Sequence, residues 1–187
     1  MDGYTVFWAK DRVEELKKAG DAGPIRVVYG GRHLREPSLV KVKVGDVIFP
    51  VALANGKLAV MARLPVDRVE PAFEYQLRET GLVRGAIVPK GVRPRTNESN
   101  QAPTCSFAPH QKPITCCSES AASGNGSSIE PRIMPDEFVP RLLFGPSDDS
   151  LKSLRFDKNG KLSVVSFSGY VRRMSPETLE IFESLFA

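Results

Sequence analysis

A long polar segment divides this chain of 187 residues and limits how it can fold. Between Arg93 and Ser128, 21 of 36 residues are Ser, Thr, Asn, Gln, Gly or Pro, and none is Val, Leu, Met, Trp or Tyr. Ordering each residue costs about 1–2 kcal/mol, and so few apolar side chains do not offset that cost. We therefore expect residues 93–128 to form a long mobile loop, with Gly124-Asn125-Gly126 as a flexible tether.

The flanking parts, residues 1–92 and 129–187, carry most of the apolar residues. We expect them to share one domain, because a chain of about 60 residues buries only about 60% of its surface. No run reaches the roughly 18 apolar residues of a membrane helix. The start, Met1-Asp2-Gly3-Tyr4, lacks the basic and apolar regions of a secretory signal. Three cysteines do not make a disulfide framework, so we expect a cytoplasmic protein with no membrane partner.

Alternation and turn residues predict strands in the first part of the chain. Three valines alternate with Lys41 and Lys43, which predicts a half-buried strand over Leu39–Val44 with a basic outer face. Asn55-Gly56 between the runs Val47–Leu53 and Lys57–Arg63 is a strong hairpin signal. Further strands are expected over residues 4–8, 25–29 and 66–70, the last extending the same sheet.

Capping residues mark the predicted helices. Asp11–Ala19 ends before Gly20, and Pro71–Thr80 ends before Gly81. Ser175 is the expected N-cap of a helix that runs to the last residues. Between them we expect a short helix at 134–137, a buried anchor at 142–144, a hairpin joining 151–156 to 161–168, and an edge strand at 170–174. The predicted fold class is α+β.

A basic stretch is the clearest functional signal. Residues 1–90 hold 15 Lys or Arg against 11 Asp or Glu, whereas 131–187 hold 8 of each, so the positive excess lies in the first part. Phosphates are neutralised by cationic side chains, and an aromatic ring among them can stack on a base. The candidate nucleic-acid-binding residues are Arg26, Tyr29, Arg32, His33, Arg35, Lys41 and Lys43. The alternative is a solvated basic face with no ligand.

The order of elements resembles the start of PUA-like β-barrel proteins, in particular their ASCH branch. The resemblance covers roughly residues 5 to 70: a helix ending at Gly20, then Pro24-Ile25-Arg26, a Gly45-Asp46-led strand and the Asn-Gly hairpin. It implies a small open barrel with flanking helices that binds RNA or a nucleotide in a cleft. The ASCH motif G-x-K-x-x-E-x-R is not met, since Gly20 to Arg26 lacks its lysine and glutamate, so no catalytic role is transferred.

Other chemistry-bearing residues favour structural roles. Cys105, His110, Cys116 and Cys117 have the spacing C-x4-H-x5-C-C, which could hold zinc, but adjacent cysteines rarely ligate one ion, and we expect free thiols. Trp8 is expected in the core rather than on a stacking platform. Asp148-Asp149 is expected in a surface turn. Neither a metal nor a cofactor is predicted.

Three functions follow from these observations. The first is a non-enzymatic module that binds RNA or another phosphate-rich ligand through the surface formed by residues 26–43. The second is a protein-interaction module, such as an immunity or antitoxin-like protein. The third is a nucleic-acid hydrolase that uses a lysine and a hydroxyl.

Overall fold

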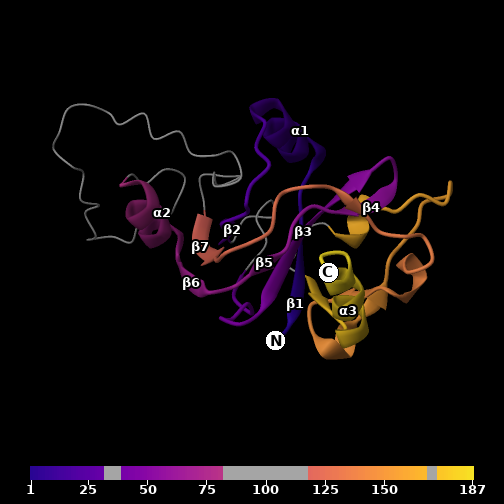
Figure 1. Cartoon of the computed structure of the whole chain (residues 1–187). Coiled ribbons are helices and arrows are strands. Elements are labelled where there is room, and N and C mark those ends of the chain that lie inside the picture. Colours follow the sequence, from indigo (N-terminus) through magenta and orange to yellow (C-terminus); the bar gives the residue numbers. More distant parts are fainter. Residues whose placement is uncertain (32–38, 82–117, 168–171) are drawn as a thin grey trace.

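The computed structural model describes residues 1–31, 39–81, 118–167 and 172–187 (Figure 1). Its elements in chain order are β1 (Gly3–Phe7), α1 (Lys10–Ala19), β2 (Val27–Gly31), β3 (Val47–Ala54), β4 (Lys57–Val60), β5 (Leu64–Pro65), β6 (Arg68–Pro71), α2 (Ala72–Thr80), β7 (Ser118–Ser123), β8 (Arg132–Ile133), η2 (Val139–Arg141), β9 (Leu143–Gly145), η3 (Asp148–Ser150), β10 (Lys152–Ser153), η4 (Val164–Ser166), β11 (Arg172–Met174) and α3 (Pro176–Ser184). The η elements are short 3₁₀ helices.

These strands form two sheets. The larger has the order β10-β9-β11-β1-β3-β4-β8, with β5 also pairing with β3, and it curls into a half-barrel. Strands β1 and β3 are parallel, from Gly3 opposite Val47 to Phe7 opposite Val51, and the other pairs given for this sheet are antiparallel. The smaller sheet has the order β2-β7-β6, with α2 beside it (Figure 1). The fold is therefore mixed α+β with a barrel-like sheet, as predicted.

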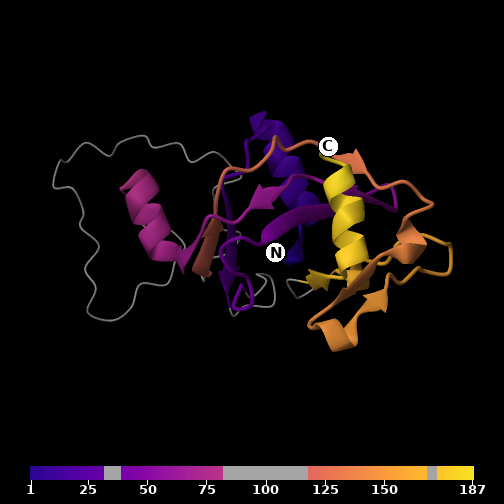
Figure 2. The same ribbon diagram turned by 60° about the horizontal axis from the view of Figure 1, so that its bottom comes forward.

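The large sheet separates two apolar cores. Along β3, Ile48 and Ala52 belong to one cluster, and Val47, Phe49 and Val51 to the other. This is the alternation expected of a strand that is covered on both faces. Helix α1 contributes to the first cluster and α3 to the second, and Figure 2 shows the sheet running between these helices. Trp8 is buried in the first cluster, at 4% exposure, as predicted.

The locally encoded elements are confirmed. Asn55 and Gly56 both have positive φ, 53° and 81°, and they connect β3 to β4 as a hairpin. Gly20 and Gly81 end α1 and α2 in the left-handed conformation. The Ser175 hydroxyl accepts a hydrogen bond from the Thr178 amide at 3.1 Å and so caps α3.

The predicted strand over Leu39–Val44 is wrong, because this segment forms turns. Val40 and Val44 are 90% and 65% exposed, whereas Leu39 and Val42 are buried, so the spacing of the buried residues is three rather than two. The Asp46 carboxylate accepts hydrogen bonds from the Lys43 amide at 2.8 Å and the Asp2 amide at 2.9 Å. These contacts fold the segment back on the start of β1. It therefore has no strand face on which Lys41 and Lys43 could be presented.

Residues 118–128 are ordered, contrary to the expected mobile loop. Strand β7 is the centre of the small sheet, between β2 and β6, and its Ala121 and Ala122 are fully buried. Beyond it, a methyl group on Gly124 would lie 2.0 Å from the Pro65 carbonyl oxygen, and one on Gly126 would lie 2.2 Å from Ile25 Cγ2. The small residues suit this passage because neighbouring backbones approach closely. Residues 93–117 lie outside the described ranges, which resume at 118.

Four further expectations change in detail. Strand β11 lies between β9 and β1 and is not at an edge. Strand β6 joins the small sheet instead of extending the β3–β4 sheet. Residues 134–137 form a turn before η2, although Leu142 and Phe144 are buried as predicted. The expected hairpin after 151 keeps its turn but only one isolated bridge, Phe156 opposite Leu162, and then η4.

Strands from both flanking parts of the chain pair with one another, β11 with β1 and β8 with β4. Within the ranges described, no helix has the length and apolar character needed to cross a bilayer.

Candidate anion-binding site

The structure describes four of the seven residues predicted to bind nucleic acid. Arg32, His33 and Arg35 lie outside the described residues. Tyr29 is only 6% exposed, and its ring packs edge-on against Tyr75 with 5.9 Å between centroids. A ring buried in this way offers no surface for a base, so Tyr29 belongs to the core between the small sheet and α2.

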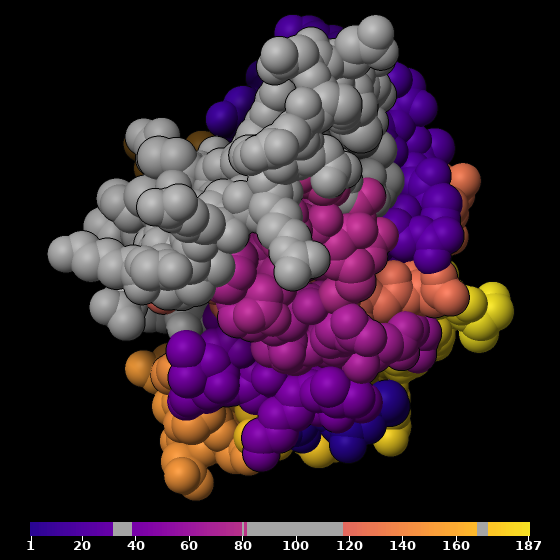
Figure 3. Space-filling view, turned by 90° about the vertical axis from the view of Figure 1, so that its left-hand side faces the viewer, coloured from indigo at the N-terminus to yellow at the C-terminus, as the bar shows by residue number. Residues whose placement is uncertain are grey.

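The three remaining cations are exposed, but they are attached to different elements. Arg26 immediately precedes β2 and donates a hydrogen bond to the side chain of Asn125. Lys41 lies in the turn segment, and its Nζ donates to the Pro146 carbonyl oxygen at 2.6 Å. In Figure 3 the violet residues, which follow residue 39 in the chain, lie beside orange residues of the C-terminal part. Lys43 is exposed in the same turn segment.

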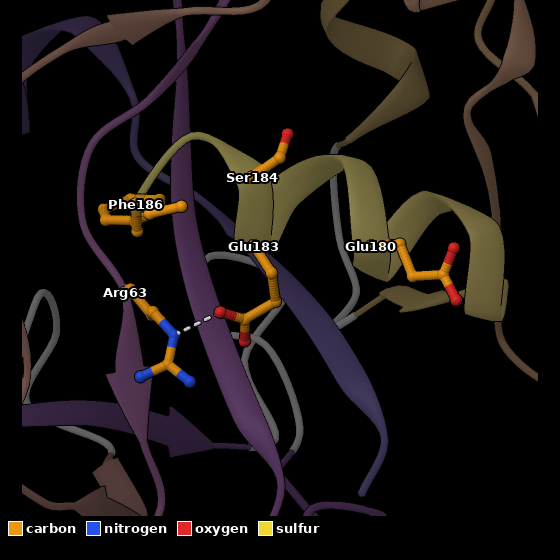
Figure 4. Close-up of a pocket in the computed structure, with 6 residues that line it drawn as sticks. Arg63, Glu180, Glu183, Ser184 and Phe186 are labelled. Atoms are coloured by element: carbon orange, nitrogen blue, oxygen red, sulfur yellow. Dashed lines mark hydrogen bonds and ion pairs between the residues drawn. The ribbon is translucent and has the colours of Figure 1, made fainter.

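One hollow in the described surface contains an ion pair. It has a volume of about 500 Å³ and lies between the C-terminal end of α3 and the segment after β4. Arg63 Nε lies 2.6 Å from Glu183 Oε2, and both side chains are about 70% buried, being 30% and 28% exposed. Figure 4 shows these two groups facing each other, with Glu180 pointing away from them. The pair is neutral and Glu180 makes the described lining net negative, so this hollow does not favour an anionic ligand.

A second hollow is strongly cationic. We call it the basic pocket; its volume is about 210 Å³, and it is lined by Phe144, Lys152, Ser153, Leu154, Arg155, Val165, Ser166 and Arg172. Three of these side chains are cationic, and none of the described residues in the lining carries a carboxylate. Within the ranges described, Lys152 and Arg155 make no ion pair. The pocket therefore concentrates positive charge in a concave site.

Strand pairing and one serine position these cations. Lys152 lies opposite Phe144 in the β10–β9 pair, and Phe144 lies opposite Met174 in the β9–β11 pair. Since β11 begins at Arg172, the sheet brings Arg172 to Lys152 although 20 residues separate them in sequence. On the other wall, the Arg155 amide donates to Ser166 Oγ at 2.8 Å, which fixes the backbone beneath the Arg155 side chain.

The neighbouring Arg173 is neutralised. Its guanidinium lies 2.7 Å from Asp2 Oδ1 and 3.0 Å from Asp148 Oδ2. Asp148 therefore has a structural role in an exposed 3₁₀ turn, in agreement with the expected surface turn. Of the Arg172-Arg173 pair, only Arg172 lines the basic pocket.

The sequence contains a signal for this pocket that a regional charge sum hides. Residues 131–187 have equal numbers of basic and acidic side chains, but residues 150–174 hold six Lys or Arg against one Asp. The acids of this part lie instead in residues 136–149 and in α3. A sum of charges over residues 150–174 alone would have pointed to Lys152, Arg155 and Arg172.

No metal site is found in the described ranges, where no cluster of three or more His, Cys, Asp or Glu side chains occurs. Cys105, His110, Cys116 and Cys117 lie outside those ranges. Comparison with known proteins gives no match to a family model, a curated protein or a solved structure.

Proposed function

We propose that this protein binds RNA or another phosphate-rich ligand through the basic pocket, and that its curled sheet is a PUA-like barrel. One observation carries the proposal: Lys152, Arg155 and Arg172 line a single hollow in which no described lining residue is a carboxylate. Guanidinium groups bind phosphate oxygens in a bidentate manner, and an ammonium group supplies a point charge. The Ser153 hydroxyl adds a neutral hydrogen-bond donor in the same lining.

Other features support a surface longer than the pocket. Lys41 contacts Pro146, which follows β9, the strand that pairs with the Lys152 strand. Lys41, and Lys43 two residues later in the same turn segment, extend the proposed surface beyond the basic pocket. Arg26, on the small sheet, is not needed for this path. The helix, Gly-Asp turn and hairpin of the PUA-like resemblance all precede the pocket in sequence.

The proposal is binding rather than catalysis. A general base or acid is usually an imidazole or a carboxylate close to the reacting group. The lining of the basic pocket contains neither, and its serines have no such partner there. A hydrolase would instead reveal itself by shortened RNA after incubation with the protein.

A salt titration tests the proposal. Fluorescence anisotropy would follow binding of a labelled single-stranded RNA of about ten nucleotides between about 50 and about 200 mM salt. Three phosphate contacts give a slope of log K against log salt near −2, because each contact contributes about −0.7 on a single strand. The double substitution Lys152→Gln and Arg155→Gln should reduce the size of that slope by about 1.4.

The matched control removes two exposed lysines from the last turn of α1, Lys17→Gln with Lys18→Gln. This variant changes the net charge equally, so its slope should stay near that of the wild type. Equal losses in both variants would mean that overall charge, not the pocket, attracts the strand. Absence of RNA and polyphosphate binding at low salt would refute the proposal.

A protein partner is the second candidate, and a specific observation favours it. Val164 and Val165 are 50% and 58% exposed, and Val165 borders the basic pocket. An acidic protein with an apolar contact would fit such a surface. In that case Val165→Asp abolishes a one-to-one complex with that protein, while RNA binding is absent.

A further inference from the structure

A third hollow shares a short segment of chain with the basic pocket. We call it the turn pocket; its volume is about 430 Å³, and it is lined by Asn55, Gly56, Lys57, Leu58, Asp136, Val139, Pro140, Phe156, Gly160, Lys161 and Leu162. Arg155 lines the basic pocket and the next residue, Phe156, lines the turn pocket. The two hollows therefore meet at residues 155–156 of one short segment.

Two Asn-Gly turns hold the turn pocket together. The Leu162 amide donates a hydrogen bond to the Gly56 carbonyl oxygen at 3.2 Å. A methyl group on Gly56 would lie 3.0 Å from Lys161 Cγ, so the two turns are in close contact. The Asp157 carboxylate closes the second turn by accepting bonds from the Asn159 and Lys161 amides at 2.8 and 2.9 Å. The pocket wall is thus fixed by backbone contacts.

Phe156 is the unusual member of the lining. Its side chain is 50% exposed, it belongs to none of the three apolar clusters, and it has no aromatic contact among the described residues. Burial in a core therefore does not account for an aromatic residue here. Leu58, Val139 and Leu162 give the hollow an apolar floor, because each is buried. A flat apolar group of a ligand would find both a floor and a ring to stack on.

The rim of the turn pocket is polar but not uniformly basic. Lys57 Nζ lies 2.7 Å from Asp136 Oδ2, with side chains 53% and 72% exposed. A carboxylate at this position repels a phosphate, whereas an amine beside a carboxylate offers a donor and acceptors to the edge of a base. Lys161 makes no ion pair in the described part of the chain and lies where a flanking phosphate could reach it.

We infer that the turn pocket takes one unpaired base of the same strand whose phosphates occupy the basic pocket, with Phe156 as its stacking platform. This inference rests on the proposed function, since it needs a nucleic-acid strand at the basic pocket. A single strand crosses the segment at residues 155–156, with a phosphate on the Arg155 side and a base on the Phe156 side. Paired bases cannot stack in this way, so the site selects single-stranded over double-stranded nucleic acid.

The test compares ligands that have bases with one that has none. Anisotropy would measure binding of single-stranded RNA, single-stranded DNA and an abasic sugar-phosphate oligomer of equal length. Phe156→Ala should weaken binding of RNA by about 5- to 150-fold, the range for loss of one stacked base. Binding of the abasic oligomer should not change. Phe156→Tyr should retain affinity, whereas Phe156→Leu, which keeps apolar bulk without a flat ring, should not.

The outcomes separate the two proposals. If Phe156→Ala leaves RNA affinity unchanged, or weakens RNA and the abasic oligomer equally, the base site is wrong, while sensitivity to Lys152→Gln with Arg155→Gln still supports the proposed function. If the wild type binds neither oligomer, the proposed function fails first. DNA that binds as tightly as RNA supports the stacking site and means that the ribose 2′-hydroxyl is not read.

Discussion

Replacing Gly124 by alanine tests whether the chain beyond β7 packs closely against its neighbours. In the structure, the added methyl group would lie 2.0 Å from the Pro65 carbonyl oxygen and 3.1 Å from Asp67 Oδ2. The first contact is with backbone, which cannot rotate away. A contact this short forces two segments apart, and overpacking of this kind costs about 1–3 kcal/mol or more. We expect a loss of about 3 kcal/mol in the free energy of unfolding, at the upper end of that range.

The opposite sign is expected if these residues were a flexible tether. In a mobile segment, alanine in place of glycine reduces the entropy of the unfolded chain and stabilises the protein by about 0.4–1 kcal/mol. Gly124→Ala therefore distinguishes the two descriptions by direction as well as size. Gly126→Ala should behave alike, because its methyl group would lie 2.2 Å from Ile25 Cγ2 and 2.6 Å from the Ile25 carbonyl oxygen.

Urea unfolding followed by tryptophan fluorescence provides the assay. The chain has one tryptophan, Trp8, which is 4% exposed and so reports directly on the main core. With a slope of about 1–3 kcal/mol per molar urea, a loss of 3 kcal/mol lowers the midpoint by about 1 to 3 M. Ser128→Ala, which adds no atoms in the same passage, is the control and should shift the midpoint little. An unchanged or raised midpoint for Gly124→Ala would refute this close packing.

Three other substitutions test the fold. Ser175→Ala should cost about 1–2 kcal/mol, because the Thr178 amide loses its buried cap, and urea midpoints would measure this. Phe182→Ala should cost about 3–5 kcal/mol, since this fully buried ring packs against Phe49 and Phe144 at 5.3 and 6.0 Å, and a cost below about 1 kcal/mol would contradict that packing. Burial, and then the charges of Asp46 and Asp2, raise the pKa of Tyr4 above its ordinary 10.0. The unfolded chain therefore loses this proton before the folded protein does as pH rises, which lowers the free energy of unfolding of the wild type. Between about pH 8 and about pH 11, the free energy of unfolding should fall more for the wild type than for Tyr4→Phe. An equal change in the two proteins would contradict the raised pKa.

Interactions within a few residues explain what could be predicted from the sequence. The turn at Asn55-Gly56, the glycine ends of α1 and α2, and the Ser175 cap depend on backbone conformation or on a bond spanning three residues. Neighbouring residues contain that information. The mixed α+β class follows from the same elements.

Long-range contacts explain where sequence reasoning failed. The valines and lysines at 39–44 alternate as in a strand, but Asp46 binds the amide of Asp2, 44 residues away, and the segment turns instead. Strand β7, within the polar segment 93–128, has few large side chains. Its small Ala121 and Ala122 are nevertheless buried, because β2 and β6 pair with it on both sides. The apolar content of a segment does not predict a buried strand of this kind, in which neighbouring strands leave no room for large side chains.

The candidate site shows the same division. The sequence predicts a cluster of cations over residues 26–43, but Tyr29 is buried, Arg26 precedes β2, and Lys41 lies in a separate turn segment against Pro146. The basic pocket requires β9 to pair with both β10 and β11, which joins Lys152 to Arg172 across 20 residues. No pattern within a short window predicts that pairing.

Residue type and near neighbours are enough to predict where α1 and α2 end, the β3–β4 turn and the number of cations in each part of the chain. Only the tertiary structure decided which cations share a hollow and which, like Arg173, are neutralised by a distant carboxylate. The physical reason is that electrostatic interaction depends on distance in space, and strand pairing sets that distance independently of separation along the chain.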